Sequence, residues 1–166
     1  MDDSLEIGSP EQFKALSHPL RQRLLFALGR EPATTSQLAV SLGERKGNVG
    51  HHLKVLREGG LVRVVETRQV RGGTEQYYQR AARRMTYPSS PPEHTQAMFG
   101  AVAEEVVRAA AVEQPLVVLR HLRVSPEVAA RMADALQGIV DEAEDAGEGE
   151  PVHGVLVTLY RRAAAP

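Results

Sequence analysis

The sequence contains no cysteine among its 166 residues. Disulfide bonds, thiolate metal sites and cysteine nucleophiles are therefore excluded. It also has no apolar run that approaches the roughly 18 residues needed by a membrane-spanning helix. The first residues, Met1 to Ser4, are acidic and lack the basic start and apolar core of a secretory signal. We therefore expect a cytoplasmic protein with no membrane partner.

The sequence shows none of the local motifs of common enzymes either. It has no glycine-rich phosphate loop, no nucleophile elbow and no paired carboxylates on a plausible catalytic surface. Serine, histidine and aspartate residues occur, but no spacing brings them together through local geometry. We therefore expect no enzymatic activity and no cofactor.

What the sequence does have is an uneven distribution of charge. The net charge is only −1, and a composition of 42% hydrophobic and 25% charged residues is ordinary for a globular protein. Residues 10–84 hold 14 Lys and Arg against six Asp and Glu, whereas residues 85–166 hold six against 12. The two parts therefore carry +8 and −6. Such asymmetry is expected when only the first part faces a polyanion.

Three short helical patterns occupy the start of residues 10–84. The segment Ser9-Pro10-Glu11-Gln12 is a capping box with proline at the first helical position, and Thr34-Thr35-Ser36-Gln37 is a second capping box. Between them, Ser17-His18-Pro19 ends the first helix and begins another, which continues to Gly29. The chain therefore begins with three short helices.

A fourth helix and a β-hairpin follow. The helix covers roughly residues 45–58. Its buried stripe has apolar residues at i, i+4 and i+7: Val49, Leu53 and Leu56. Strands at about 61–66 and 75–80 then flank a polar, glycine-bearing loop at residues 67–73. A helix–turn–helix followed by a hairpin is the winged-helix arrangement.

The free face of the fourth helix is the predicted reading surface for DNA. If the apolar stripe points inward, this face carries lysines and a histidine but no acid. In helix–turn–helix proteins the N-terminal part of the second helix meets the base edges, where Arg and Lys suit guanine and Asn suits adenine. We predict four base contacts: Arg45, Lys46, Asn48 and His51. We interpret Gly47 and Gly50 as places where the backbone approaches DNA, or alternatively as a frayed first turn.

The hairpin tip is the second predicted contact surface. Arginine beside Gly72-Gly73 can enter the minor groove or contact phosphates, although a solvated turn is the alternative. The hydroxyls at the start of the third helix can donate to phosphate, and a capping role explains them equally well. The predicted backbone and wing contacts are Thr35, Ser36, Lys54, Arg68, Gln69 and Arg71.

The second half begins with a linker at residues 85–92 and continues as a C-terminal region at 93–166. Ser90-Pro91-Pro92-Glu93 is a third capping box, opening a helix that runs to about Val112. Its alanine-rich apolar stripe allows another helix to approach closely, so we predict a dimerisation helix; packing on the same chain's winged domain is the alternative. The predicted dimer contacts are Phe99, Val102, Val106 and Ala109.

The remaining pattern is strand–helix–strand. Strands at 116–124 and 152–160 flank a helix that begins after Ser125-Pro126-Glu127, and an acidic loop occupies 141–150. The strands could pair with the helix over one face, and the module could hold a small apolar effector or enlarge the dimer. The predicted fold class is α+β, mainly α. It combines a winged helix-turn-helix domain at 10–84, a dimerisation helix and a small strand–helix–strand extension.

Two segments carry a family resemblance. FKALSHPLRQRLL at residues 13–25 and VGHHLKVLREGGLV at residues 49–62 resemble the ArsR family of bacterial transcriptional regulators. The strand–helix–strand region resembles the C-terminal extension of ArsR-like proteins from actinobacteria. The ArsR resemblance covers about residues 10–80, and Tyr77-Tyr78 also fits. It implies a homodimer that binds an inverted-repeat operator in double-stranded DNA, usually as a repressor released by a ligand. Gly50 departs from the family's common serine, so a hydroxyl contact to DNA is missing.

Two alternatives remain beside this function. ArsR-like metal sites use cysteines, which are absent here, or Asp/Glu/His sets on the dimer helix, where only one histidine occurs. That helix offers Glu93, His94, Glu104 and Glu105, whereas zinc needs about four ligands in a tetrahedral array. We therefore expect no metal and leave a small-molecule effector open. A winged-helix protein-interaction module is the other alternative, and the basic residues of the fourth helix and the tip favour DNA.

Overall fold

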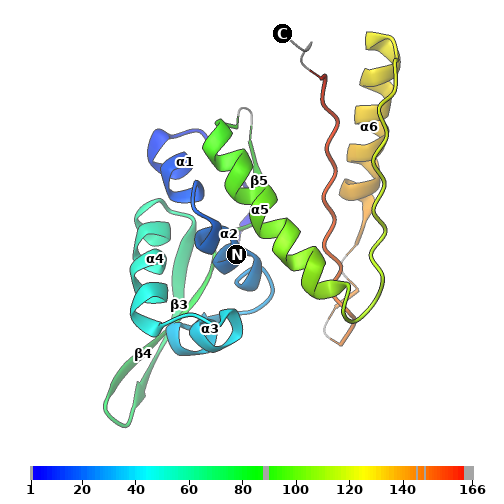
Figure 1. Cartoon of the computed structure of the whole chain (residues 1–166). Coiled ribbons are helices and arrows are strands. Elements are labelled where there is room, and N and C mark those ends of the chain that lie inside the picture. Colours follow the sequence, from blue (N-terminus) through cyan, green and yellow to red (C-terminus); the bar gives the residue numbers. More distant parts are fainter. Residues whose placement is uncertain (1, 88–89, 145, 148, 163–166) are drawn as a thin grey trace. The chain divides into compact units, whose positions relative to one another are not determined.

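The computed structural model describes residues 2–87, 90–144, 146–147 and 149–162. The chain divides into two compact units, residues 1–115 and 116–166, which are considered separately (Figure 1). None of the helices in the described ranges combines the length and apolar character needed to cross a membrane.

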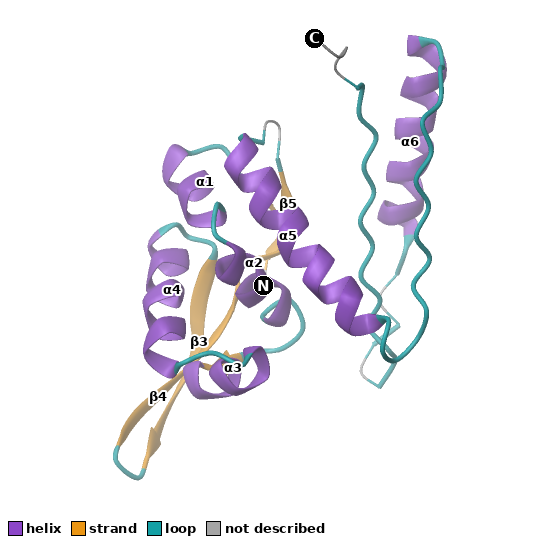
Figure 2. Cartoon of the chain, viewed as in Figure 1, coloured by secondary structure: helices purple, strands orange, loops and turns teal. Residues whose placement is uncertain are grey.

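The first unit contains the winged helix-turn-helix arrangement predicted from the sequence. Its helices are α1 (Pro10–Leu16), α2 (Pro19–Ala27), α3 (Thr35–Leu42), α4 (Lys46–Glu58) and α5 (Pro92–Ala109). Its strands are β1 (Asp2–Glu6), β2 (Ala33–Thr34), β3 (Val62–Val70), β4 (Gly73–Arg80) and β5 (Ala82–Thr86). Strands β2, β4 and β3 form an antiparallel sheet in that order, and the β3–β4 hairpin extends beyond α3 and α4 (Figure 2). The predicted class, α+β and mainly α with a winged helix-turn-helix domain, is confirmed.

The helix starts follow the predicted caps in the first half of the chain. The Ser9 and Thr34 side chains each accept from the backbone N–H three residues later, and the glutamine at that position completes both capping boxes. The His18 ring caps α2, because its Nδ1 accepts from the Leu20 N–H at 3.1 Å. At the other end of α3, Gly43 adopts the left-handed conformation that ends many helices.

The apolar stripe of α4 lies in the core of this unit. Val49, Leu53 and Leu56 have no solvent exposure, as predicted. They belong to one cluster with apolar residues of α1, α2 and α3, with Leu61, and with Val62 at the start of β3. The inward face of α4 is therefore fixed by the same core that holds the other helices.

The parallel pairing of β1 with β5 was not predicted. Asp2 lies opposite Ala82 and Glu6 opposite Thr86. Residues 85–86, expected in the linker, therefore end a strand, while residues 88–89 lie outside the described residues. Strand β1 is mostly exposed and polar, so its sequence lacks the alternation that marks a half-buried strand.

The predicted capping box at the start of α5 is wrong. The helix has Pro91 as its N-cap and no side-chain cap hydrogen bond. The Ser90 hydroxyl instead lies 2.8 Å from His94 Nδ1 and 2.8 Å from the Thr95 hydroxyl. Because Ser90 lies one residue before the cap position, its hydroxyl meets side chains of the first turn. The helix also ends at Ala109, before the predicted Val112.

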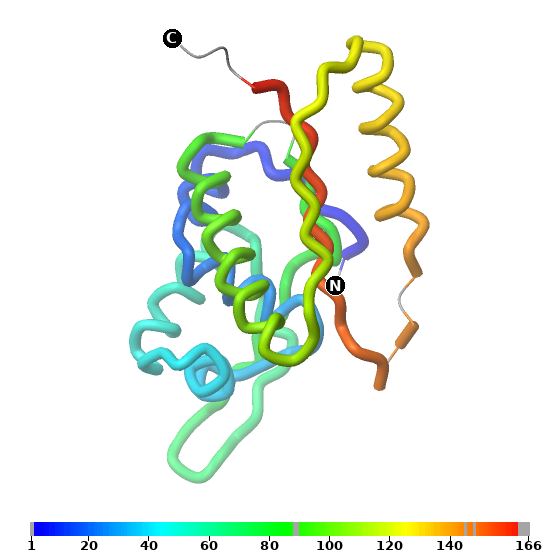
Figure 3. The backbone as a smooth tube through the Cα atoms, turned by 45° about the vertical axis from the view of Figure 1, so that its right-hand side comes forward, coloured from blue at the N-terminus to red at the C-terminus, as the bar shows by residue number. Residues whose placement is uncertain are grey.

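The second unit consists of α6 (Pro126–Glu142) between two extended segments (Figure 3). The helix and its Ser125 cap are as predicted, and Ser125 Oγ accepts from the Val128 N–H at 3.3 Å. The predicted strands at 116–124 and 152–160 are wrong, because neither is hydrogen-bonded into a sheet. Their apolar side chains remain exposed, and no residue of α6 is buried. Apolar, β-branched sequence alone does not supply the paired neighbour that a strand requires.

The Thr34 cap gives a direct test of this fold. Replacing Thr34 with alanine removes the acceptor for the Gln37 N–H, which lies 3.2 Å away, and should lower the free energy of unfolding by about 1 kcal/mol. Urea denaturation followed by circular dichroism measures this loss. The control is Thr35→Ala, since the Thr35 side chain is not the cap of α3. Equal losses in both variants would contradict the assignment of the cap.

Candidate nucleic-acid interface

The outward face of α4 carries the predicted base contacts. Arg45 is the N-cap residue, and Lys46, Asn48 and His51 are exposed on the first turns of the helix. Lys54 is exposed one turn further along and pairs with Glu58 at 3.9 Å. The structure therefore brings the four predicted base-contacting residues to one exposed end of α4, with Lys54 farther along the helix.

Gly50 faces the neighbouring helix rather than open solvent. It is half-buried, and a Cβ atom built on it would lie 3.8 Å from the Thr35 methyl group, an ordinary van der Waals distance. Gly47 by contrast has nothing within 4 Å of such an atom. Of the two glycines that we interpreted as sites of close backbone approach, Gly47 thus has the open surroundings that this interpretation needs.

A shallow groove joins three elements of the interface. It has a volume of about 200 Å³ and lies where the starts of α3 and α4 meet strand β4. Its lining residues are Thr35, Ser36, Lys46, Thr74, Glu75, Gln76 and Tyr78. Because Thr34 caps α3, the Thr35 and Ser36 hydroxyls are not needed for capping. The structure therefore places both hydroxyls beside Lys46.

The wing is a tight hairpin, not the long loop predicted for residues 67–73. Strands β3 and β4 pair as far as Val70 and Gly73, which leaves Arg71 and Gly72 as the turn. Gly72 has a φ of 106°, a backbone conformation that glycine adopts without steric cost. The strands therefore continue through most of the expected loop.

The two wing arginines differ in their surroundings. Arg68 lies on β3, where it forms an ion pair with Glu66 (Nη2 to Oε2, 2.9 Å) and stacks 4.5 Å from the centre of the Tyr77 ring. Arg71 lies at the tip, exposed, with no ion pair found for it in the described part of the chain. Gln69, on β3 between them, approaches the Thr74 hydroxyl at 3.5 Å. Arg71 is therefore the wing cation available to a ligand.

Three histidines form a cluster that sequence reasoning missed: His51 and His52 on α4, and His18 at the start of α2. The rings of His18 and His52 are 4.3 Å apart, and those of His51 and His52 are 5.2 Å apart. Arg21 Nη1 lies 3.4 Å from His52 Nδ1. Burial, together with the nearby His18 and Arg21, lowers the pKa of His52 to about 4. His18 also has a lowered pKa, chiefly because of burial. The His51-His52 pair was visible in sequence, but His52 lies outside the apolar stripe that we used to assign the buried face.

One protein-family model matches part of this chain. Residues 16–65, which include α2, α3, α4 and the start of β3, match the model of a helix-turn-helix domain family. This segment therefore resembles that family in sequence, and it has the helix-turn-helix fold in the structure. No curated protein matches the chain significantly.

Solved structures similar to this chain include three bacterial proteins. The homodimeric winged helix-turn-helix DNA-binding domain Mb0332 of Mycobacterium bovis, described as a possible ArsR-family regulator, has 21% identity and a TM-score of 0.37, over 66% of this chain and 85% of that one. The transcriptional repressor BigR of Xylella fastidiosa has 23% identity and a TM-score of 0.35, over 63% and 86%. Rv0081 of M. tuberculosis has 26% identity and a TM-score of 0.35, over 64% and 97%.

The helix-turn-helix domain and the rest of the described chain contain no group of three or more His, Asp or Glu side chains arranged to hold a metal ion. His94, the histidine considered for such a site on α5, is fully buried. Its ring lies 4.6 Å from that of Tyr87 and 5.9 Å from that of Phe13. The surroundings of His94 are therefore those of a packing residue that anchors α5 to α1.

The buried His52 predicts acid sensitivity of the helix-turn-helix domain. As pH falls from 6.5 towards 4, the unfolded chain binds a proton at this position that the folded chain does not, so the free energy of unfolding decreases. His52→Gln should reduce this loss by roughly 2 kcal/mol between pH 7 and pH 4. Urea denaturation at several pH values measures the difference. The exposed His121→Gln variant is the control, and parallel pH profiles for all three proteins would rule out a role for His52.

Proposed function

We propose that this chain is a sequence-specific DNA-binding transcriptional regulator, with α4 in the major groove and the wing against the backbone. The main support for this proposal is that no side chain caps the N-terminal end of α4. Side chains of Ser9, His18 and Thr34 cap α1, α2 and α3, whereas Arg45 makes no such hydrogen bond to α4. The first N–H groups of α4 are therefore free beside Arg45 and Lys46, an arrangement that favours anions.

The predicted contacts keep their roles in this proposal. Four residues at the start of α4 contact base edges: Arg45, Lys46, Asn48 and His51. The backbone contacts come from α3, α4 and the wing: Thr35, Ser36, Lys54, Gln69 and Arg71. Arg68 can join them by exchanging its ion pair with Glu66 for a phosphate.

The ArsR resemblance of residues 13–25 and 49–62 supports a more specific proposal about assembly, operator and effector. We propose a cytoplasmic, ArsR-like homodimer without enzymatic activity that represses transcription from an inverted-repeat operator and responds to a small organic effector rather than a metal. A two-fold dimer would place its two α4 helices in successive major grooves on one side of the DNA.

Helix α5 supplies the proposed dimer surface. Its inward face is formed by His94, Ala97 and Ala101, which are buried in the first unit. Ala101, one of the alanines of α5, is thus buried within the chain and is not available to a partner. The neighbouring stripe remains partly open: Phe99 is 40% exposed, and the proposed contacts Val102 and Val106 are half-buried. Together with the exposed Ala109, they form a surface that a second α5 could cover.

Selection of bound duplexes from a random DNA pool tests the function. We expect the chain to enrich an inverted repeat with half-sites about one helical turn apart. Lys46→Ala should change the preference at one base pair per half-site by roughly 1–3 kcal/mol. Arg71→Ala should instead weaken binding to all sequences and reduce its salt dependence. Absence of any enriched sequence would favour the alternative of a protein-interaction module.

The dimer surface is tested separately by sedimentation. Val106→Asp places a charge within the proposed stripe, so we expect monomers. The matched control is Val107→Asp, because Val107 is 73% exposed and lies about 100° around the helix from Val106. A dimer that survives the first substitution but not the second would move the interface to the other side of α5.

A further inference from the structure

The turn between α3 and α4 holds its one acidic residue in a fixed place. Gly43 lies in the left-handed region with φ of 67°, and its N–H donates to the Val40 carbonyl at 3.2 Å. The Glu44 N–H donates to the Ala39 carbonyl at 2.8 Å. These bonds form the C-terminal cap of α3 and fix the backbone from which the Glu44 side chain starts.

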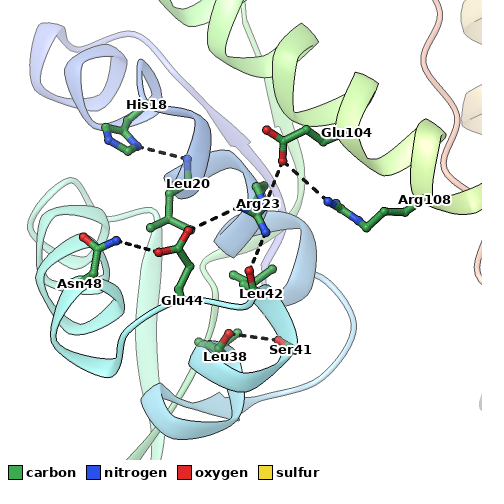
Figure 4. Close-up of polar contacts among 10 residues, drawn as sticks. All are labelled: His18, Leu20, Arg23, Leu38, Ser41, Leu42, Glu44, Asn48, Glu104 and Arg108. Carbon is green, nitrogen blue, oxygen red and sulfur yellow. Dashed lines mark hydrogen bonds and ion pairs between the residues drawn. The ribbon is translucent and has the colours of Figure 1, made fainter.

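The Glu44 carboxylate contacts a predicted base-contacting residue. Its Oε2 accepts a hydrogen bond from Asn48 Nδ2 at 3.0 Å, as Figure 4 shows. Because an ionised carboxylate only accepts hydrogen bonds, the Asn48 amide must turn its nitrogen towards Glu44. The amide oxygen, Oδ1, is then left for another partner.

Arg23 on α2 restrains the carboxylate from its other side (Figure 4). Its Nη1 lies 3.7 Å from Glu44 Oε1, and its Nη2 donates to the Leu42 carbonyl at 2.8 Å. Its Nε lies 3.5 Å from Glu104 Oε2 on α5, which also pairs with Arg108. The side chain of Arg23 is only 17% exposed, so this restraint is partly shielded from water. Glu44 is therefore held between a largely buried cation and the exposed Asn48.

An acid at this position requires an explanation if the proposed function is correct. A carboxylate in the turn that precedes a DNA-reading helix repels phosphates and weakens binding to every sequence. Arg23 already pairs with Glu104 on α5, so its charge has a partner besides Glu44. Glu44 additionally fixes the orientation of the Asn48 amide. Without the carboxylate, rotation about the last side-chain bond would exchange the positions of Oδ1 and Nδ2.

We propose that Glu44 is a positioning residue that determines the base preference of Asn48. With Nδ2 held by Glu44, Asn48 presents Oδ1 to the DNA and accepts a hydrogen bond from an exocyclic amine, as in adenine or cytosine. This inference rests on the proposed DNA binding and specifies how one of its base contacts is selected. The cost of ordering the amide is met within the free protein, before DNA binds.

Two substitutions that change the charge equally distinguish orientation of Asn48 by Glu44 from repulsion of DNA phosphates by Glu44. Glu44→Ala frees the amide, so selection from random DNA should lose preference at one base pair, roughly tenfold. Glu44→Gln should instead reverse the preference at that base pair. Since Arg23 only donates, the introduced glutamine turns its oxygen to Arg23 and its nitrogen to Asn48, which then presents Nδ2 and favours a base carbonyl. Both variants remove one negative charge, so both should bind non-specific DNA more tightly.

Asn48→Ala identifies the base pair concerned. It should lose the same preference as Glu44→Ala, and the double variant should lose no more than either single variant. Identical base preferences in Glu44→Ala and Glu44→Gln would leave Glu44 with only an electrostatic effect and overturn the inference. An unchanged preference in Asn48→Ala would also overturn it, while altered selection by Lys46→Ala would still support the proposed DNA binding.

A measurement without DNA tests the structural premise. The side-chain amide resonances of Asn48 should shift in Glu44→Ala relative to the unmodified full-length chain, because the hydrogen bond to the carboxylate is lost. Glu58→Ala, which removes an exposed acid at the C-terminal end of α4, provides the control and should leave the Asn48 resonances unshifted. Unmoved Asn48 resonances in Glu44→Ala would refute the inference even if DNA selection behaved as proposed.

Discussion

The packing of one side of α4 into the core is the interaction on which the rest of the interface depends. Val49, Leu53 and Leu56 are completely buried, and α4 contacts α1, α2, α3 and β3. Burial of each such side chain stabilises the fold by about 1.5–3 kcal/mol, so together they strongly favour one rotation of the helix about its axis. That rotation determines that Lys46 and His51 point outward. The polar face is thus positioned by apolar contacts on the opposite side.

The charged residues add a second level of order to this arrangement. Arg23 connects the turn before α4 with Glu104 on α5, so the proposed reading and dimerisation helices share one partly buried cation. Exposed ion pairs contribute little to stability, but a shielded guanidinium that also binds the Leu42 carbonyl fixes geometry more firmly. A shift of α5 relative to α2 would therefore alter the restraint on Glu44. Through Arg23, a change in the position of α5 would therefore reach the turn before α4.

Local patterns predicted the helices well, and contacts distant in sequence were predicted poorly. The buried stripe of α4 and the Thr34 cap depend on neighbours within one turn and are confirmed. Strand β1 escaped prediction because its pairing with β5 joins segments about eighty residues apart. The segments 116–124 and 152–160 have the composition of strands but no pairing. Within the site, the partners of Arg68 and Asn48 could not be predicted, because each depends on side-chain orientation and not on residue type.

The separation of α4 into a buried and an exposed face also bears on how such a protein can diverge after gene duplication. Exposed positions generally tolerate substitution within about 0.5 kcal/mol, so Lys46 or His51 can change without unfolding the domain. A duplicated copy could therefore acquire a different target by a few substitutions, while its core remained the same. Asn48 is the exception among these positions, because a useful change there also depends on the residue at position 44. Two coupled positions diverge more slowly than two independent ones.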